Sequence, residues 1–114
     1  METHEMKLFE KSFEKIKNKQ KDIEVRLFDE KRRLIKLGDK IKFRKLPNLN
    51  EDILIEVVGL SVFPTFRDLF LNFSSERFGH GGLGIDEQIS RVYEIYDKQA
   101  ETKNSVVGIH LKLI

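Results

Sequence analysis

The segment that decides the fold spans residues 19–43 and reads KQKDIEVRLFDEKRRLIKLGDKIKF. Its first apolar positions are Ile23, Val25 and Leu27. They alternate with Glu24 and Arg26, and a period of two predicts a strand with one apolar face and one charged face. The charged pair therefore lies on a strand, with both side chains on the same side.

Further strands and helices are predicted on either side of this segment. Period-two alternation predicts strands around Ile41 and Phe43, from Ile53 to about Val62, and over residues 105–114, besides a brief strand at the N-terminus. Apolar spacings of three and four predict helices over residues 8–18, from Thr65 and from Asp86, with both of the latter as N-caps. The buried stripe of the first helix is predicted to contain Phe9, Phe13 and Ile16, and that of the last Ile89, Val92, Tyr93 and Tyr96.

This irregular mixture of short strands and helices favours a small α+β barrel over a doubly wound parallel sheet. Eight apolar residues are predicted to fill one barrel core: Ile23, Val25, Ile41, Phe43, Ile55, Val57, Ile109 and Leu111. Glu24 and Arg26 then face a cleft. At 114 residues, the length fits one domain over 1–114.

The composition indicates where the protein works. The chain has no cysteine, which predicts a reducing cytoplasm and no disulfide framework. Its first 15 residues carry acids and lack the apolar region of a signal peptide, and no run approaches the roughly 20 apolar residues of a membrane span. We therefore expect a cytoplasmic protein with no membrane partner.

Positive charge is concentrated in the first part of the chain. Up to Lys45 there are 15 Lys and Arg against 9 acids, whereas from Leu46 onward there are 6 against 10. Because charges act within a Debye length of about 8–10 Å, this asymmetry matters more than the net charge. It indicates either an anion-binding face or an ordinary solvated surface of mixed charge.

The motif Lys21-x-x-Glu24-x-Arg26 resembles the GxKxxExR signature of the ASCH family, with the leading glycine replaced by Lys19. Other stretches resemble the family in the same order: FEKIKNK, IKLGDKIKF, FPTFRDLF, YEIYDKQ and VVGIHL. ASCH domains belong to the PUA-like superfamily. The resemblance therefore implies one PUA-like β-barrel domain over 1–114, with about five to six mixed strands and two to three helices beside a cleft.

The resemblance also implies a class of function, namely binding of RNA or of a nucleoside. Some members resemble an amidohydrolase acting on N4-acetylcytidine, and ribonuclease activity occurs in the family. In the amidohydrolase pattern a Thr follows the Lys by three residues, and a catalytic Glu lies in a later glycine-containing region. Here Glu24 stands in the Thr position, and FGHGGL at 78–83 offers no Glu. Were the protein an enzyme, Lys21 and Glu24 would be its catalytic pair; the sequence leaves this open.

The residue types of the motif suit a nucleotide. A guanidinium such as Arg26 contacts phosphate in a bidentate manner, and a carboxylate such as Glu24 accepts from an exocyclic amine or a ribose hydroxyl. The alternative is that Lys21, Glu24 and Arg26 form structural ion pairs that only shape the barrel.

Four further residues are candidate ligand contacts: Arg32, Arg33, His80 and Tyr96. Each has a simpler interpretation, because charge runs are usually solvated, loop histidines are usually only polar, and tyrosines at helical spacing are usually core. The stretch at 79–84 matches GxGxxG, but no strand precedes it, so we interpret it as a mobile loop at the mouth of the cleft.

No cofactor and no metal is predicted, because the three histidines are far apart in sequence and have no cysteine partners. The leading hypothesis is a binder of RNA, a nucleoside or a nucleotide, in a cleft lined by Lys21, Glu24 and Arg26. A hydrolase acting on the same ligands is the alternative, and a third reading is an interaction module whose basic face meets an acidic protein.

Overall fold

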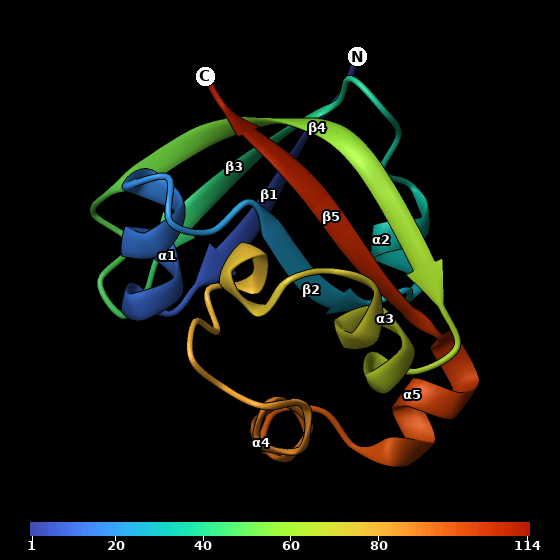
Figure 1. The fold of residues 1–114 in the computed structure, drawn as a ribbon. Helices are drawn as coiled ribbons and strands as arrows, with labels where there is room; N and C mark the ends of the chain where they lie inside the picture. Colours follow the sequence, from blue (N-terminus) through green and yellow to red (C-terminus); the bar gives the residue numbers. More distant parts are fainter.

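A computed structural model describes residues 1–114, which form a curled five-stranded sheet with five short helices around it (Figure 1). The elements in chain order are β1 (Thr3–Leu8), α1 (Glu10–Lys17), β2 (Ile23–Leu27), α2 (Glu30–Arg33), β3 (Lys40–Lys45), β4 (Asp52–Phe63), α3 (Phe66–Asn72), the 3₁₀ turn η1 (Ser75–Phe78), α4 (Ile85–Val92), α5 (Lys98–Asn104) and β5 (Val106–Leu113). The strand order is β1-β3-β4-β5-β2, and only the β1–β3 pair is parallel. The predicted α+β, barrel-like fold with five to six mixed strands is confirmed.

The long strand β4 makes the sheet curl. Its first half pairs with β3 and its second half with β5, so it crosses the whole sheet. The pairing with β5 shifts between Val57 and Gly59, which is the irregularity of a β-bulge and bends the strand. A side chain at Gly59 would place its Cβ only 3.0 Å from the His110 ring, so glycine lets β4 approach this ring without displacing it.

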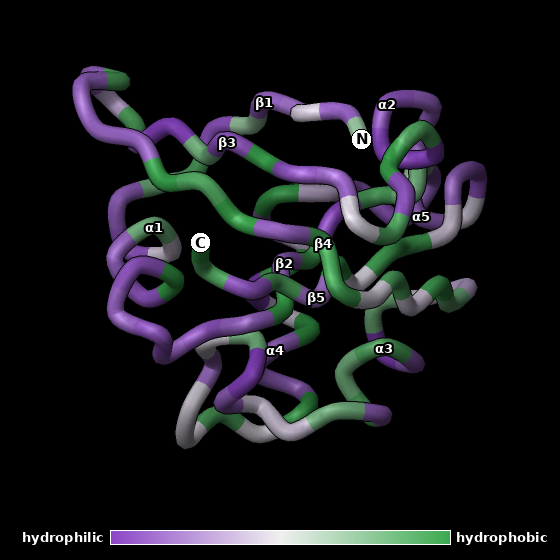
Figure 2. The backbone as a smooth tube through the Cα atoms, turned by 90° about the horizontal axis from the view of Figure 1, so that it is seen from above, coloured by the Kyte–Doolittle hydropathy of each residue, from purple (hydrophilic) through white to green (hydrophobic).

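Apolar residues are buried on both faces of the sheet. The cluster inside the curl contains Met6, Leu8, Phe13, Ile16, Ile35, Ile41, Phe43, Ile55, Val57, Val107, Ile109 and Leu111. The cluster on the opposite face contains Ile23, Phe66, Leu69, Phe70, Phe78, Val92 and Val106, and it lies under α3, η1 and α4. In Figure 2 the tube of β4 is coloured hydrophobic over much of its length, as expected for a strand between two apolar layers. No helix in the structure combines the length and the apolar character needed to cross a membrane.

The prediction that Ile23 and Val25 point into the barrel core is wrong. Both pack in the second cluster, whereas Glu24 and Arg26 lie directly opposite Ile109 and Val107 on the inner face. Alternation identifies two faces but not which one is inner. Here the helices cover the outer face of β2 with apolar residues, and the charged residues take the inner position at the edge of the sheet.

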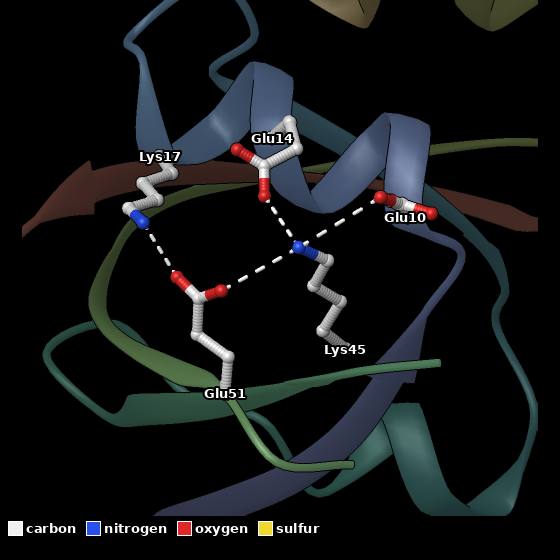
Figure 3. A network of polar contacts seen from close by, with 5 residues as sticks. All are labelled: Glu10, Glu14, Lys17, Lys45 and Glu51. Atoms are coloured by element: carbon white, nitrogen blue, oxygen red, sulfur yellow. Dashed lines mark hydrogen bonds and ion pairs between the residues drawn. The ribbon is translucent and has the colours of Figure 1, made fainter. Parts of the chain in front are cut away.

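Helix α1 is anchored by packing and by charge. Phe13 and Ile16 are buried, as predicted, but Phe9 is 65% exposed because it precedes the helix with extended backbone, so the helical period does not apply to it. The Lys45 ammonium lies among three carboxylates from α1 and the β3–β4 connection, at 2.7 Å from Glu14, 3.4 Å from Glu51 and 3.9 Å from Glu10 (Figure 3). The buried Phe13 and Ile16 determine which side of α1 faces the sheet, and this network of partly exposed ion pairs adds a contact between the helix and the β3–β4 connection.

The later helices are held together by one buried carboxylate. Thr65 caps α3 through the Asp68 amide, as predicted. The predicted cap at Asp86 is wrong, since α4 begins one residue earlier, after Gly84. Helix α5 was not anticipated, and its Glu101 carboxylate accepts from the Phe66 amide at 2.8 Å and from the Tyr93 hydroxyl at 2.6 Å.

These contacts change the acidity of the Tyr93 hydroxyl. Burial, followed by the hydrogen bond to Glu101 and the charge of that carboxylate, raises the pKa of Tyr93 to about 12. Ionising Tyr93 would bring a second negative charge against a buried one, so the hydroxyl stays protonated and continues to donate.

We predict that Glu101→Ala lowers the free energy of unfolding by about 2–3 kcal/mol, because it leaves two donors without their acceptor. Glu94→Ala, at an exposed position without a side-chain hydrogen bond, is the matched control and should change it little. Urea unfolding measures both values. Equal stability of the two variants would contradict the assigned role of Glu101.

Candidate functional site

A cleft with a volume of about 350 Å³ lies beside β2, where the edge of the sheet meets the start of α1 and the end of α4. Five of the candidates proposed from sequence line it: Lys21, Glu24, Arg26, His80 and Tyr96. Pockets for small ligands usually measure about 300–1,000 Å³, so the cleft is large enough for one compact molecule.

At the base of the cleft, Glu24 is held between two cations. Its Oε1 lies 2.8 Å from the Lys21 ammonium and its Oε2 accepts from Arg26 Nε at 2.7 Å. All three side chains are largely withdrawn from solvent. Lys21 reaches this position because the chain reverses after α1 through Lys19 in a left-handed conformation (φ 62°), and the Lys21 amide then donates to the Lys15 carbonyl.

This arrangement keeps Glu24 ionised. Burial alone would raise the pKa of Glu24, but the charges of Lys21 and Arg26 and their hydrogen bonds outweigh it and hold the pKa below its ordinary value. Since both oxygens already have partners, Glu24 is a poor proton acceptor and a good fixed negative charge.

Arg26 also joins the two edges of the sheet. Its Nη2 donates to the Lys7 carbonyl of β1 at 2.8 Å, and Lys31 Nζ donates to the Glu5 carbonyl at 3.0 Å. The strands β1 and β2 are not paired, so these side chains satisfy carbonyls that would otherwise form an open edge. The triad of Lys21, Glu24 and Arg26 is therefore structural as well as accessible from the cleft.

His80 lies opposite the triad in a fixed orientation. Gln88 Nε2 donates to the Leu83 carbonyl, so its Oε1 faces His80 Nδ1 at 3.0 Å. That nitrogen must then carry the proton, and Nε2 is left as an acceptor without a protein donor. Burial, opposed by the Gln88 hydrogen bond and reinforced by the charges of Lys21 and Lys15, lowers the pKa of His80, which favours the neutral ring.

The remaining walls are apolar and aromatic. Tyr96 stacks on Phe66, with ring centroids 5.4 Å apart, and is one of the residues that line the cleft. Phe9 and Ile95 also line the cleft and are 65% and 62% exposed. Exposed apolar side chains of this size at a cleft mouth are suited to contacting a flat ring.

The other two arginines proposed from sequence do not line the cleft. Arg32 pairs with Asp29 at 3.0 Å, and the Arg33 guanidinium lies 4.2 Å from the centre of the Phe28 ring. Their part in ligand binding stays a prediction.

A group of possible metal ligands, which the sequence spacing did not indicate, is formed by Glu2, His4 and Asp39. The Asp39 carboxylate already contacts the His4 ring at 2.8 Å and accepts from the Glu2 and Lys36 amides. Hydrogen bonds to His4 and to the backbone hold the pKa of Asp39 at about 2. The cluster ties β1 to the turn before β3, and its geometry is explained without an ion.

Several residues of the site are not among those predicted from the sequence. Gln88 was detectable, because it is a polar residue on the apolar stripe of α4 and is buried. Phe9 and Arg91 gave no such signal, since their approach to the cleft depends on how α1 and α4 pack.

Two solved structures match the entire chain. "Hypothetical protein PH0355" is 35% identical over the full length of both chains with a TM-score of 0.88. Protein PF0455 from Pyrococcus furiosus is 36% identical, with 100% of this chain and 98% of that chain covered and a TM-score of 0.78. No protein-family model and no curated protein matches the sequence.

An ASCH protein from Zymomonas mobilis matches at 12% identity with a TM-score of 0.64, covering 96% of this chain and 66% of that one. At this identity the similarity establishes the fold. The chain belongs to the family of the two archaeal proteins, with an ASCH-like fold. The resemblance seen in the sequence is thereby confirmed at the level of the fold.

We predict that Glu24→Gln destabilises this ASCH-like protein by on the order of 3 kcal/mol at pH 7, because it leaves two buried cations uncompensated. A carboxyl whose folded pKa is lowered stabilises the protein fully above its unfolded pKa, roughly 4.3, and loses this contribution as the pH falls through the folded value. The stability gap between wild type and Glu24→Gln should therefore narrow below about pH 4. Urea unfolding at pH 7 and pH 3 measures this difference in the free energy of unfolding, with Glu94→Gln as the control. A difference that does not change with pH would contradict the assignment of Glu24 as an ionised, paired carboxylate.

Proposed function

We propose that this protein binds RNA or a modified nucleoside, with the sugar and base held in the cleft beside β2. The observation that carries the proposal is the convergence of a fixed carboxylate, two cations and a neutral histidine acceptor on one cleft with apolar walls. The ASCH-like fold is compatible with this class of ligand.

The polar groups complement a nucleoside. Arg26 and Lys21 are donors, while Glu24 and the His80 Nε2 are acceptors, so the cleft offers partners for carbonyls, exocyclic amines and ribose hydroxyls. Recognition of RNA bases commonly combines such contacts with stacking on an aromatic ring. Phe9, exposed at the mouth, is the side chain best placed to stack.

Binding rather than catalysis is favoured by the state of Glu24. A general base works best with a pKa near neutrality, but burial is here outweighed by the charges and hydrogen bonds of Lys21 and Arg26, so the pKa of Glu24 is lowered. The carboxylate is better suited to orienting a ligand than to removing a proton from water. Hydrolysis of N4-acetylcytidine or of RNA remains the alternative function.

We expect fluorescence anisotropy to detect binding of short single-stranded RNAs. A plot of log affinity against log salt concentration should be linear, with a slope of about −0.7 for each phosphate contacted. Phe9→Ala should weaken this binding by about 1–3 kcal/mol through loss of stacking. Leu71→Ala is the control, because Leu71 is 63% exposed on α3 and does not line the cleft. Equal binding by both variants would exclude Phe9 as a stacking residue.

We further expect no detectable product when the wild type is incubated with N4-acetylcytidine or with short RNA, because its only carboxylate in the cleft is paired. Chromatography of the reaction mixture tests this. Robust turnover that is abolished by both Lys21→Ala and Glu24→Gln would replace the binding function with the hydrolase.

A further inference from the structure

A second pocket of about 330 Å³ adjoins the cleft between α1 and the glycine-rich loop after η1. Its charged lining consists of Lys11, Lys15, Lys21 and Arg91, and no acidic residue lines it. Four cations around one small space repel each other, and this repulsion is relieved when an anion enters.

The charges of α1 are divided between two faces of the helix. Glu10 and Glu14, one turn apart, face Lys45 on the side of the β3–β4 connection (Figure 3). Lys11 comes directly after Glu10, and Lys15 comes directly after Glu14. The two lysines therefore form a neighbouring stripe on α1, and this stripe lines the pocket. Glu10 and Glu14 thus pair with Lys45 and do not neutralise Lys11 and Lys15.

Lys15 is fixed in this pocket by a backbone group. Its ammonium donates to the Gly79 carbonyl at 2.6 Å and has no carboxylate partner. Gly79 is left-handed (φ 77°), and a Cβ there would lie 3.2 Å from side-chain carbons of both Lys15 and Lys21, so glycine makes room for the two lysines. Burial and then the charges of Lys11, Lys21 and Arg91 lower the pKa of Lys15, as expected where positive charge is not compensated.

Of the four cations, two have an acid nearby. Lys21 pairs with Glu24 at the base of the cleft, and Arg91 contacts Glu87 at 3.3 Å on the exposed surface of α4. Lys11 is exposed and forms no ion pair, so Lys11 and Lys15 carry the uncompensated charge.

The pocket and the cleft form one continuous site. They share four lining residues: Ser12, Lys21, His80 and Arg91. A ligand can therefore place a neutral ring system against Tyr96 and Phe9 and an attached anionic group beside Lys11 and Lys15.

We propose that the second pocket is a phosphate subsite, and that the ligand of this protein is a nucleotide or an RNA phosphodiester rather than a neutral nucleoside. This inference rests on the proposed function, because it assumes that the nucleoside occupies the cleft. Phosphate suits the pocket because lysine ammonium groups bind its oxygens as point charges, and no acid is present to oppose it.

The test compares, by isothermal titration calorimetry, the four ribonucleosides and N4-acetylcytidine with the 5′- and 3′-monophosphates of these nucleosides and with a short single-stranded RNA. We expect at least one monophosphate to bind at least about tenfold more tightly than its nucleoside. The double variant Lys11→Gln, Lys15→Gln should lose this gain while retaining nucleoside affinity, and Lys15→Arg should keep it. The double variant Lys40→Gln, Lys112→Gln, which removes the same charge outside both pockets, should behave as the wild type.

Since Lys15 also supports the loop at Gly79, thermal unfolding and the single variant Lys11→Gln separate lost binding from lost folding. A gain seen only with RNA would assign the pocket to an internal phosphodiester and support the inference. If nucleosides bind and phosphate adds nothing, or the Lys11/Lys15 variant matches its control, the subsite is overturned while the proposed function stands. If none of the probes binds, the proposed function is overturned, and the subsite with it.

Discussion

The ion triad around Glu24 is the constraint on which both the sheet and the site depend. An ionised carboxylate is stable at this depth only while Lys21 and Arg26 stay in place. Arg26 also donates to the Lys7 carbonyl, so the same side chain compensates the charge of Glu24 and joins β1 to β2. The barrel is closed at this seam by side chains rather than by backbone pairing, and the opening that remains beside β2 is the cleft.

Sequence periodicity predicted the strands because their apolar residues recur with a period of two, although β2 and β5 also bury consecutive residues in the folded sheet. It also placed Glu24 and Arg26 on one face of β2. It assigned Ile23 and Val25 to the wrong layer, because alternation carries no information about which apolar layer is inside a curled sheet. That distinction arises from the helices after β4, which build a second apolar cluster on the outer face.

The features that the sequence did not reveal depend on contacts between distant residues. Helix α5 has no apolar stripe, and its role comes from Glu101, which binds groups 35 and 8 residues away. Likewise Lys15 and Gly79 are 64 residues apart, and their contact brings the basic stripe of α1 to the glycine-rich loop. The charge asymmetry of the sequence indicates a basic region in the first part of the chain. Arg91 comes from the later part, in which acids outnumber bases, and it joins the lysines around the second pocket only because α4 packs near α1.

The site separates groups that are fixed from groups that are free to respond to a ligand. Glu24 pairs with Lys21 at 2.8 Å and with Arg26 at 2.7 Å, so the three side chains provide a rigid pattern of donors and acceptors. Lys11 and Lys15 have no carboxylate partner, and their mutual repulsion is lowered only by an anion from outside the chain. In the proposed binding mode, shape and hydrogen bonding in the cleft would select the neutral part of the ligand, while electrostatic attraction at the adjoining pocket would supply affinity that depends on ionic strength. An ASCH-like fold alone does not determine this division, because it is set by the side chains on α1 and the Gly79 loop.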